Sequence, residues 1–184
     1  MVKVGKGAGI FIKHVGPYLK KWTRKSGKAL RGVLRGSLYE MEGLGLKKGF
    51  KFVKRSAAER EALRAAFDAT ERKAFLKGLK ESELKAAGLT EAEIAKVMRG
   101  EVPKGFQVHH KFPLDDSGTN VPENLVLIRN SPDHQLLTNH QNYTTGHLKP
   151  GESVTVDWPT FPAGTSVWPP AGGGAKPIPT PKGR

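Results

Sequence analysis

The chain has 184 residues, enough for one compact domain with appendages or for two small units, so a large multidomain machine is excluded. It carries 31 Lys and Arg against 17 Asp and Glu, and this formal net charge of +14 favours a polyanionic partner, either nucleic acid or an acidic membrane surface. It has no cysteine, which excludes disulfides and cysteine-ligated metals, so any metal must be held by His, Asp, Glu or Asn.

The positive charge is concentrated at the N-terminus. Residues 1–55 hold 15 Lys and Arg, two Glu and ten Gly, a net charge of +13, whereas residues 56–184 have a net charge of +1. We therefore predict that residues 1–55 form a basic, Gly-rich, partly flexible extension, with one or two short cationic helices over residues 17–34. There is no run of 18 or more apolar residues and no Sec-type signal, so we expect no membrane span.

The middle of the chain shows helix-start signals. Ser56 with Glu59 and Thr90 with Glu93 are capping boxes, in which each side chain bonds to the backbone N–H of the other residue. These signals predict a helical lead-in over residues 56–102, with helices at about residues 56–77, 82–88 and 90–100.

After Pro103 the sequence pattern becomes typical of β-strands. Residues 106–110 and 125–128 are predicted strands, and the second is apolar at every position, so we expect it to be covered on both faces. Residues 115–123 are a turn-rich loop, residues 132–140 a helix, and residues 155–157 a last short strand. The Pro/Gly-rich residues 169–184 are predicted to be disordered.

Three of the six histidines fall within this strand, loop, strand and helix segment: His109, His110 and His134. Successive side chains of a strand point to opposite faces, so His109 and His110 should have different roles. One imidazole could bind a metal while the other stays free as a general base. His134, in the first turn of the predicted helix, is a candidate second ligand, and a metal held by few protein groups keeps positions for water or phosphate oxygens.

The order HH, GTN, ENLVLI and His resembles the HNH, or ββα-metal, nucleases, with Asn124 14 residues after His110 and His134 a further 10 on. The segment is similar to the HNH DNase toxin domains at the C-termini of bacterial polymorphic toxins, including type VI secretion and Rhs-type effectors. The resemblance covers residues 84–159 and is strongest over residues 103–142.

The resemblance implies roles for four residues. His109 matches the first metal ligand and His110 the general base that activates the attacking water. Asn124 matches the residue that ties the loop together and orients the base, and His134 matches the helix-borne metal ligand. The fold class implied is α+β, with the nuclease core over residues 103–168.

The chain departs from the family pattern in two ways. Colicin-type members place a third histidine one turn after the helix ligand, where this chain has Thr138, and the zinc-binding Cys pairs that brace many members are absent. We therefore expect His109, His134 and water to form the metal shell, with a carboxylate of the loop as an additional candidate ligand. Asp115 and Asp116 are interpreted as turn formers. Lys111 and Arg129 could contact phosphate but are interpreted as solvated basic residues. Three histidines are interpreted as non-catalytic: His14, His140 and His147.

The resemblance implies a divalent-metal-dependent, largely nonspecific DNA endonuclease that uses Mg²⁺ in vivo or else Zn²⁺, Mn²⁺ or Ni²⁺. It further implies an antibacterial toxin with a secretion carrier and a cognate immunity protein, exported without a Sec signal and active in the target-cell cytoplasm. RNA remains an alternative substrate. Two other classes remain open: a noncatalytic nucleic-acid-binding protein with a His-bound structural metal, and a membrane-active cationic protein. Removal of residues 1–55 is expected to weaken DNA binding while cleavage persists.

Overall fold

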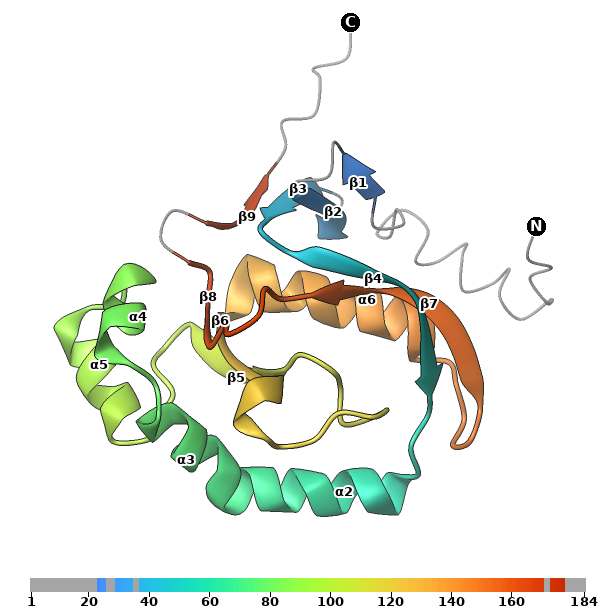
Figure 1. Cartoon of the computed structure of the whole chain (residues 1–184), viewed down its shortest axis with the longest axis horizontal. Coiled ribbons are helices and arrows are strands. Elements are labelled where there is room, and N and C mark those ends of the chain that lie inside the picture. Colours follow the sequence, from blue (N-terminus) through green and yellow to red (C-terminus); the bar gives the residue numbers. More distant parts are fainter. Residues whose placement is uncertain (1–22, 26–28, 35–36, 171–172, 178–184) are drawn as a thin grey trace, which may run out of the picture.

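The computed structural model describes residues 23–25, 29–34, 37–170 and 173–177. The protein is of the α+β class, as predicted, with three small sheets and a set of helices (Figure 1). The first sheet contains four strands in the order β1-β2-β3-β9, the second pairs β4 with β7, and the third has the order β5-β6-β8.

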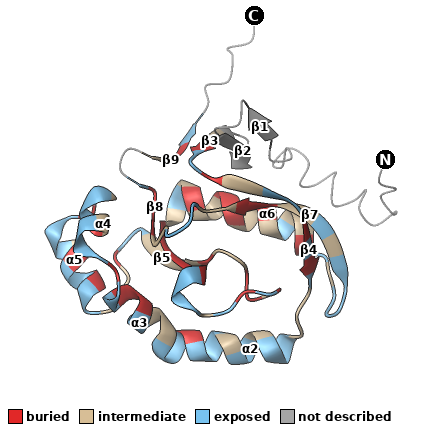
Figure 2. Cartoon of the chain, viewed as in Figure 1, coloured by how far each residue is buried: buried red, intermediate tan, exposed pale blue. Residues whose placement is uncertain are grey.

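The helical lead-in follows the capping signals. Helix α2, Ala57–Ala66, begins at the Ser56 capping box and continues through a π-helical turn, Phe67–Glu71, into α3, Arg72–Lys77. Helix α4 spans Glu81–Ala86, and α5, Glu91–Met98, begins at the Thr90 capping box. No residue of α2 is buried, and Figure 2 shows this helix exposed along most of its length.

Two antiparallel strands and a helix follow the lead-in. Strand β5, Phe106–His110, pairs with β6, Leu125–Arg129, so that His109 lies opposite Val126 and His110 opposite Leu125. A helical turn, Asn130–His134, leads into α6, Gln135–Thr145. Within that turn only Ser131 has extended backbone angles, so the continuous helical conformation begins at Pro132, where the helix is predicted to start.

Strand β6 is covered on both faces, which confirms the prediction from its uninterrupted apolar sequence. Val126 and Ile128 belong to a core cluster that includes residues of α6, whereas Leu125 and Leu127 belong to a second cluster formed mainly by α3, α4 and α5. The alternation of a strand thus places β5 and β6 between two separate cores.

The N-terminal segment is not an extension of the kind predicted. Where the structure describes residues 17–34, they form β1, Thr23–Lys25, and β2, Ala29–Leu34, so the predicted cationic helices are wrong there. Glycines disfavour a helix in this segment, and the neighbouring β3, Ser37–Glu42, pairs with β2 along its whole length.

The predicted boundary at residues 55 and 56 also fails as a boundary between separate units. Strand β4, Gly45–Val53, pairs with β7, Ser153–Thr160, and Met41 and Leu44 are buried in the same core cluster as Val126. Removing residues 1–55 would therefore remove a sheet strand and core side chains, so persistence of cleavage in that truncation is no longer expected. Residues 1–22 lie outside the described part of the chain.

The C-terminal tail is partly ordered, which corrects the prediction of disorder over residues 169–184. Strand β8, Val167–Trp168, runs parallel to β6, and β9, Gly174–Pro177, pairs antiparallel with β3. The sequence is Pro- and Gly-rich, but Ala175 is buried and its strand finds hydrogen-bond partners on β3. Residues 178–184 lie outside the described part.

Among the described residues, no helix has the length and apolar character needed to cross a membrane.

Candidate functional site

The two adjacent histidines of β5 face opposite sides of the strand. The ring of His110 packs against Phe67 of the helical lead-in, with ring centroids 4.6 Å apart. The ring of His109 lies 4.9 Å from that of His134 and 6.5 Å from that of Phe161. The structure therefore brings His109 and His134 together and separates both from His110, as strand alternation requires.

His110 is nearly fully buried, and a relay of two hydrogen bonds through Asn120 holds its ring. Its Nε2 lies 2.9 Å from Oδ1 of Asn120, and Nδ2 of Asn120 donates to the backbone carbonyl of Leu63 in α2 at 2.9 Å. The amide of Asn120 is thus oriented by α2, and it in turn orients the imidazole of His110.

This relay defines the tautomer of neutral His110. Because the amide nitrogen of Asn120 is used toward Leu63, its Oδ1 faces His110 as an acceptor, and Nε2 of His110 must donate. The lone pair of neutral His110 then lies on Nδ1, to which no described residue donates a hydrogen bond. An imidazole in this state can accept a proton at Nδ1.

The surroundings of His110 favour its neutral form. Burial is the largest influence and lowers its pKa below the usual value; the positive charge of Arg64 acts in the same direction, while the hydrogen bond to Asn120 opposes it. A histidine with a lowered pKa is deprotonated at neutral pH, the state in which a general base acts.

The His109–His134 pair lies on the other side of β5, where both side chains are half-buried. Their rings are almost perpendicular, at 82°. Burial lowers the pKa of His134 to about 4, and burial together with the nearby histidines lowers the pKa of His109 well below its usual value. Both imidazoles are therefore neutral at pH 7 and have lone pairs available to a cation.

Thr138 occupies the position where colicin-type nucleases have a third histidine. Its Oγ1 lies 3.3 Å from Nδ1 and 3.4 Å from Nε2 of His134, so the hydroxyl contacts the ring one helical turn away. Among the described residues no group of three or more His, Cys, Asp or Glu side chains converges on one point. The donor set is thus a pair of neutral imidazoles, a suitable but incomplete shell for Zn²⁺, Ni²⁺ or another divalent cation.

Asn124 closes the loop between β5 and β6. Its Oδ1 accepts from the backbone N–H of Phe112 at 2.8 Å, and its Nδ2 donates to the carbonyls of Phe112 at 3.0 Å and Thr119 at 2.8 Å. The side chain is nearly fully buried and has no hydrogen bond to His110. The loop-tying role implied by the resemblance fits this geometry, whereas the amide that orients His110 belongs to Asn120.

The same loop is tied to neighbouring elements by its two aspartates. Asp115 pairs with Lys54 at 2.7 Å, and buried Asp116 accepts from the backbone N–H of Val53 at 2.8 Å. These bonds connect the loop to the end of β4. Both carboxylates are therefore engaged in loop structure, in keeping with their interpretation as turn formers.

Lys111 and Arg129, interpreted as solvated, are both partly exposed, and each also has a polar partner. Lys111 is half-buried and donates from Nζ to the carbonyl of Glu123 at 2.7 Å. Arg129 pairs with the buried carboxylate of Asp133, with both Nε and Nη2 2.6 Å from Oδ2.

The remaining histidines lie away from the His109–His134 pair. His140 is buried against Trp158, and its Nε2 lies 3.0 Å from the carbonyl of Asp157, whereas His147 is exposed. His14 is outside the described residues.

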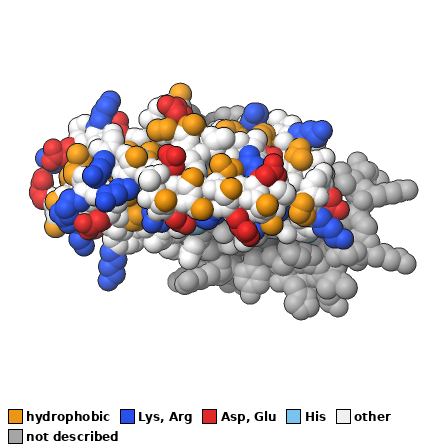
Figure 3. Space-filling view, turned by 90° about the horizontal axis from the view of Figure 1, so that it is seen from below, with side chains coloured by type: hydrophobic (Ala, Val, Ile, Leu, Met, Phe, Trp, Pro, Cys, Tyr) orange, Lys and Arg blue, Asp and Glu red, His pale blue; other side chains and the backbone are white. Residues whose placement is uncertain are grey.

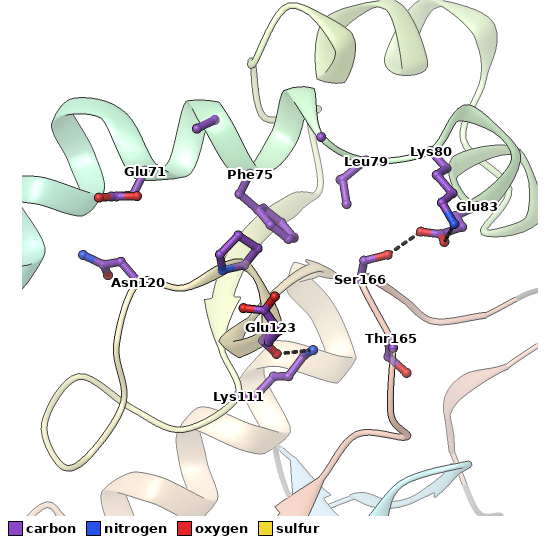
Figure 4. A pocket seen from close by; sticks show the side chains of 14 residues that line it. Glu71, Phe75, Leu79, Lys80, Glu83, Lys111, Asn120, Glu123, Thr165 and Ser166 are labelled. Atoms are coloured by element: carbon purple, nitrogen blue, oxygen red, sulfur yellow. Dashed lines mark hydrogen bonds and ion pairs between the residues drawn. The ribbon is translucent and has the colours of Figure 1, made fainter.

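A pocket of about 440 Å³ opens on the side of Asn120, between α3 and the segment that precedes β8 (Figure 4). Asn120 and Glu71 lie at one end of it and Glu83 at the other, with Lys111 and Glu123 between them. Asn120 thus connects a solvent-accessible hollow to His110.

Two residues of the site escaped the sequence reasoning. Asn120 belongs to the GTN triplet and resembles an ordinary turn residue, and Asp133 precedes His134 without matching any motif. Several polar residues lie in the loop that follows His110, but only the fold shows which of their side chains points toward that histidine.

The chain is 36% identical over 139 residues to the uncharacterized protein YhhZ of Escherichia coli (strain K12). The match covers 76% of this chain and 35% of that protein, so the chain spans about a third of the relative's length. No protein-family model matches the chain, and no solved structure matches it.

Proposed function

We propose that the chain is a divalent-metal-dependent endonuclease with a ββα-metal core, in which His110 is the general base and His109 and His134 are metal ligands. The observation that carries this proposal is the separation of His110 from the His109–His134 pair on opposite faces of β5. His110 is neutral and oriented by Asn120 on one face, and two neutral imidazoles lie 4.9 Å apart on the other.

The roles of the residues follow from the chemistry of phosphodiester hydrolysis. Nδ1 of His110 accepts the proton of the attacking water, and the hydrogen bond to Asn120 keeps Nε2–H in place and disperses the charge that His110 gains. His109 and His134 would hold the cation, which acts when bound as a Lewis acid that neutralises charge on the phosphate oxygens. Asn124 maintains the loop that follows His110.

Exposed cations near this region support a nucleic acid as substrate. Lys47, Lys48 and Lys51 lie exposed on β4, and Nζ of Lys47 lies 5.6 Å from the ring centroid of Phe112, two residues beyond His110. These lysines belong to residues 1–55, whose net charge is +13, and they suit contacts to phosphates, which carry no sequence information. We therefore propose largely nonspecific cleavage of DNA, with RNA as the alternative substrate.

The face seen from below, on which Lys and Arg alternate with Asp and Glu, has no single-sign patch (Figure 3). This mixture agrees with the near-neutral balance of residues 56–184. Among the described residues, the β4 side of the molecule is thus the better candidate for phosphate contact.

A nonspecific nuclease is toxic to any cell that contains it. We therefore propose that the chain is the toxin part of an interbacterial effector, which a carrier exports through a specialised secretion system and a cognate immunity protein neutralises in the producing cell. Expression of the intact wild-type chain should be lethal without the immunity protein, and harmless expression would count against this role.

Plasmid cleavage tests the proposed reaction. The wild-type chain should nick and linearise plasmid DNA in the presence of Mg²⁺, Mn²⁺, Zn²⁺ or Ni²⁺ and not in a chelator. His110→Ala should lower the cleavage rate roughly a thousandfold, and the matched variant of the exposed His147, His147→Ala, should cleave like wild type. Equal cleavage by His110→Ala and wild type would refute the mechanism.

The same experiment distinguishes the alternatives. A noncatalytic nucleic-acid-binding protein would shift DNA in a gel without cleaving it at any metal, and the His110→Ala variant would bind equally well. Leakage from anionic liposomes without nuclease activity would instead favour a membrane-active protein.

A further inference from the structure

Asp133 is a fully buried carboxylate, with an exposed fraction of 0%, and it directly precedes His134. Oδ2 accepts a hydrogen bond from Nε of Arg129 at 2.6 Å, and Nη2 of the same guanidinium forms an ion pair with it at 2.6 Å. Oδ1 accepts from the indole N–H of Trp168 at 3.3 Å and from the backbone N–H of Ala175 at 2.8 Å. Three residues from three separate strands thus converge on one side chain.

Such convergence is needed for a buried charge to be stable. A buried carboxylate without partners is strongly destabilising, whereas one paired with a guanidinium and bonded by two further N–H donors is satisfied. The bonds also fix the backbone of residue 133, because each donor is itself held: Arg129 by β6, Trp168 by β8 and Ala175 by β9.

The C-terminal segment packs closely at this point. Gly174 has a φ of +95°, and a Cβ built on it would lie 2.7 Å from Nη2 of Arg129 and 2.8 Å from Cβ of Pro169. Only glycine allows the backbone to approach the Arg129–Asp133 pair this closely. Residues 167–170 and 173–177 therefore pack closely against the turn that carries His134.

This segment borders the other histidine of the pair as well. The ring of Phe161 lies edge-on to that of Trp168, with centroids 5.4 Å apart, and 6.5 Å from the ring of His109. Trp168 is thus linked to His134 through Asp133 and to His109 through Phe161.

We infer that Asp133 is a positioning residue that makes the placement of His134 beside His109 depend on the packing of β8 and β9. The three hydrogen bonds to Asp133 hold the Asn130–His134 turn against β8 and β9, and so hold the His134 ring at its distance from His109. The link to metal binding rests on the proposed function; the link to ring placement does not.

The test compares three variants of the full chain. Asp133→Asn keeps the shape of the side chain but removes its charge. Trp168→Phe removes only the indole N–H and retains an aromatic ring in the core. Asp116→Asn is the matched control, because Asp116 is also buried and bonded to a backbone N–H, but in the loop between β5 and β6.

The first readout is the nuclear Overhauser effect between the ring protons of His109 and His134 in the metal-free protein. It should be strong in wild type and in Asp116→Asn, and weakened in Asp133→Asn and, to a smaller extent, in Trp168→Phe. The second is Ni²⁺ affinity by calorimetry, which should fall roughly tenfold in Asp133→Asn, the scale reported for outer-shell residues.

The two readouts separate failure of this inference from failure of the proposed function. Unchanged ring contacts in Asp133→Asn and Trp168→Phe would overturn the inference whatever the enzyme activity. If Asp133→Asn does not fold, Trp168→Phe decides the matter, since that change leaves the carboxylate and Arg129 in place. Absence of Ni²⁺ binding in wild type would refute the metal site and leave the ring-contact result valid.

Discussion

His109 and His110 are neighbours in the chain, yet they occupy different surroundings. His110 lies on the face of β5 that packs against the helical lead-in, with one amide partner and an aromatic wall. His109 lies on the face that borders α6 and the C-terminal strands, beside a second imidazole. Each face has its own hydrophobic core.

The different surroundings of His109 and His110 show how two adjacent histidines can have different roles, metal binding for one and proton transfer for the other. A histidine whose lone pair ligates a metal cannot use that lone pair to accept a proton, so the two roles need two imidazoles. Strand alternation separates the two imidazoles without any insertion in the chain, because successive side chains point in opposite directions. The largest effects are therefore expected from substitution of His110, which should slow cleavage without weakening metal binding, and of His134, which should weaken metal binding.

His110→Ala should lower the rate of DNA cleavage roughly a thousandfold, the usual contribution of a general base, with Ni²⁺ affinity unchanged. His134→Ala should lose Ni²⁺ affinity by more than the roughly tenfold to hundredfold that the loss of an outer-shell partner costs. Calorimetry and plasmid cleavage measure the two effects. Loss of Ni²⁺ binding in His110→Ala would contradict the separation of the two faces.

Asn124 stabilises the loop that leaves β5 just after the two histidines. Asn124→Ala leaves the N–H and C=O of Phe112 and the C=O of Thr119 without partners, and should lower the free energy of unfolding by about 3 kcal/mol. Urea denaturation measures this loss. Asn142→Ala, at an exposed position of α6, is the control. An equal decrease in the free energy of unfolding in both variants would contradict the stabilisation of the loop by Asn124.

The stability of the metal-free protein should fall in acid. His140 is buried and burial lowers its pKa to about 4, against 6.5 for an ordinary histidine, so the unfolded chain binds more protons between these values. Its share of the free energy of unfolding is complete above about pH 6.5 and is lost as pH falls toward 4.

Between pH 7 and pH 5 this share should fall by about 2 kcal/mol. His140→Gln cannot titrate, so its loss of stability over the same interval should be smaller than that of wild type, as measured by urea denaturation at each pH. Parallel pH dependences of the two proteins would show that His140 is not the titrating group.

Asn120 should have the smallest effect. Asn120→Ala leaves Nε2–H of His110 without its acceptor and should lower the cleavage rate about tenfold. Asn120→Asp should shift the acidic limb of the pH–rate profile to higher pH, because a carboxylate stabilises the imidazolium and the base is then deprotonated only at higher pH. A profile identical to wild type in Asn120→Asp would exclude this positioning role.

Local patterns predicted much of the fold correctly. The capping boxes at Ser56 and Thr90 start α2 and α5, the apolar run at residues 125–128 is a strand covered on both faces, and residues 106–110 are a strand. These signals depend on neighbouring residues, which the sequence contains in full.

Several of the errors concern pairing between segments that lie far apart in the chain. Strands β4 and β9 have Lys-, Gly- and Pro-rich sequences that resemble linkers, and they become strands only because β7 and β3 supply their hydrogen bonds. Asn120 and Asp133 were missed for the same reason: the partners of Asn120 lie on α2 and β5, and those of Asp133 on β6, β8 and β9. No local pattern reports a partner that distant.

The pairing of β3 with β9 has a consequence for synthesis. Strand β3 spans Ser37–Glu42 and its partner Gly174–Pro177, so β3 is made early and its outer edge stays open while most of the chain is translated. The last donor to reach the carboxylate of Asp133, the N–H of Ala175, arrives at the same moment. A nascent chain interrupted before residue 174 therefore carries all four histidines from His109 to His140 but lacks the strand that completes their support.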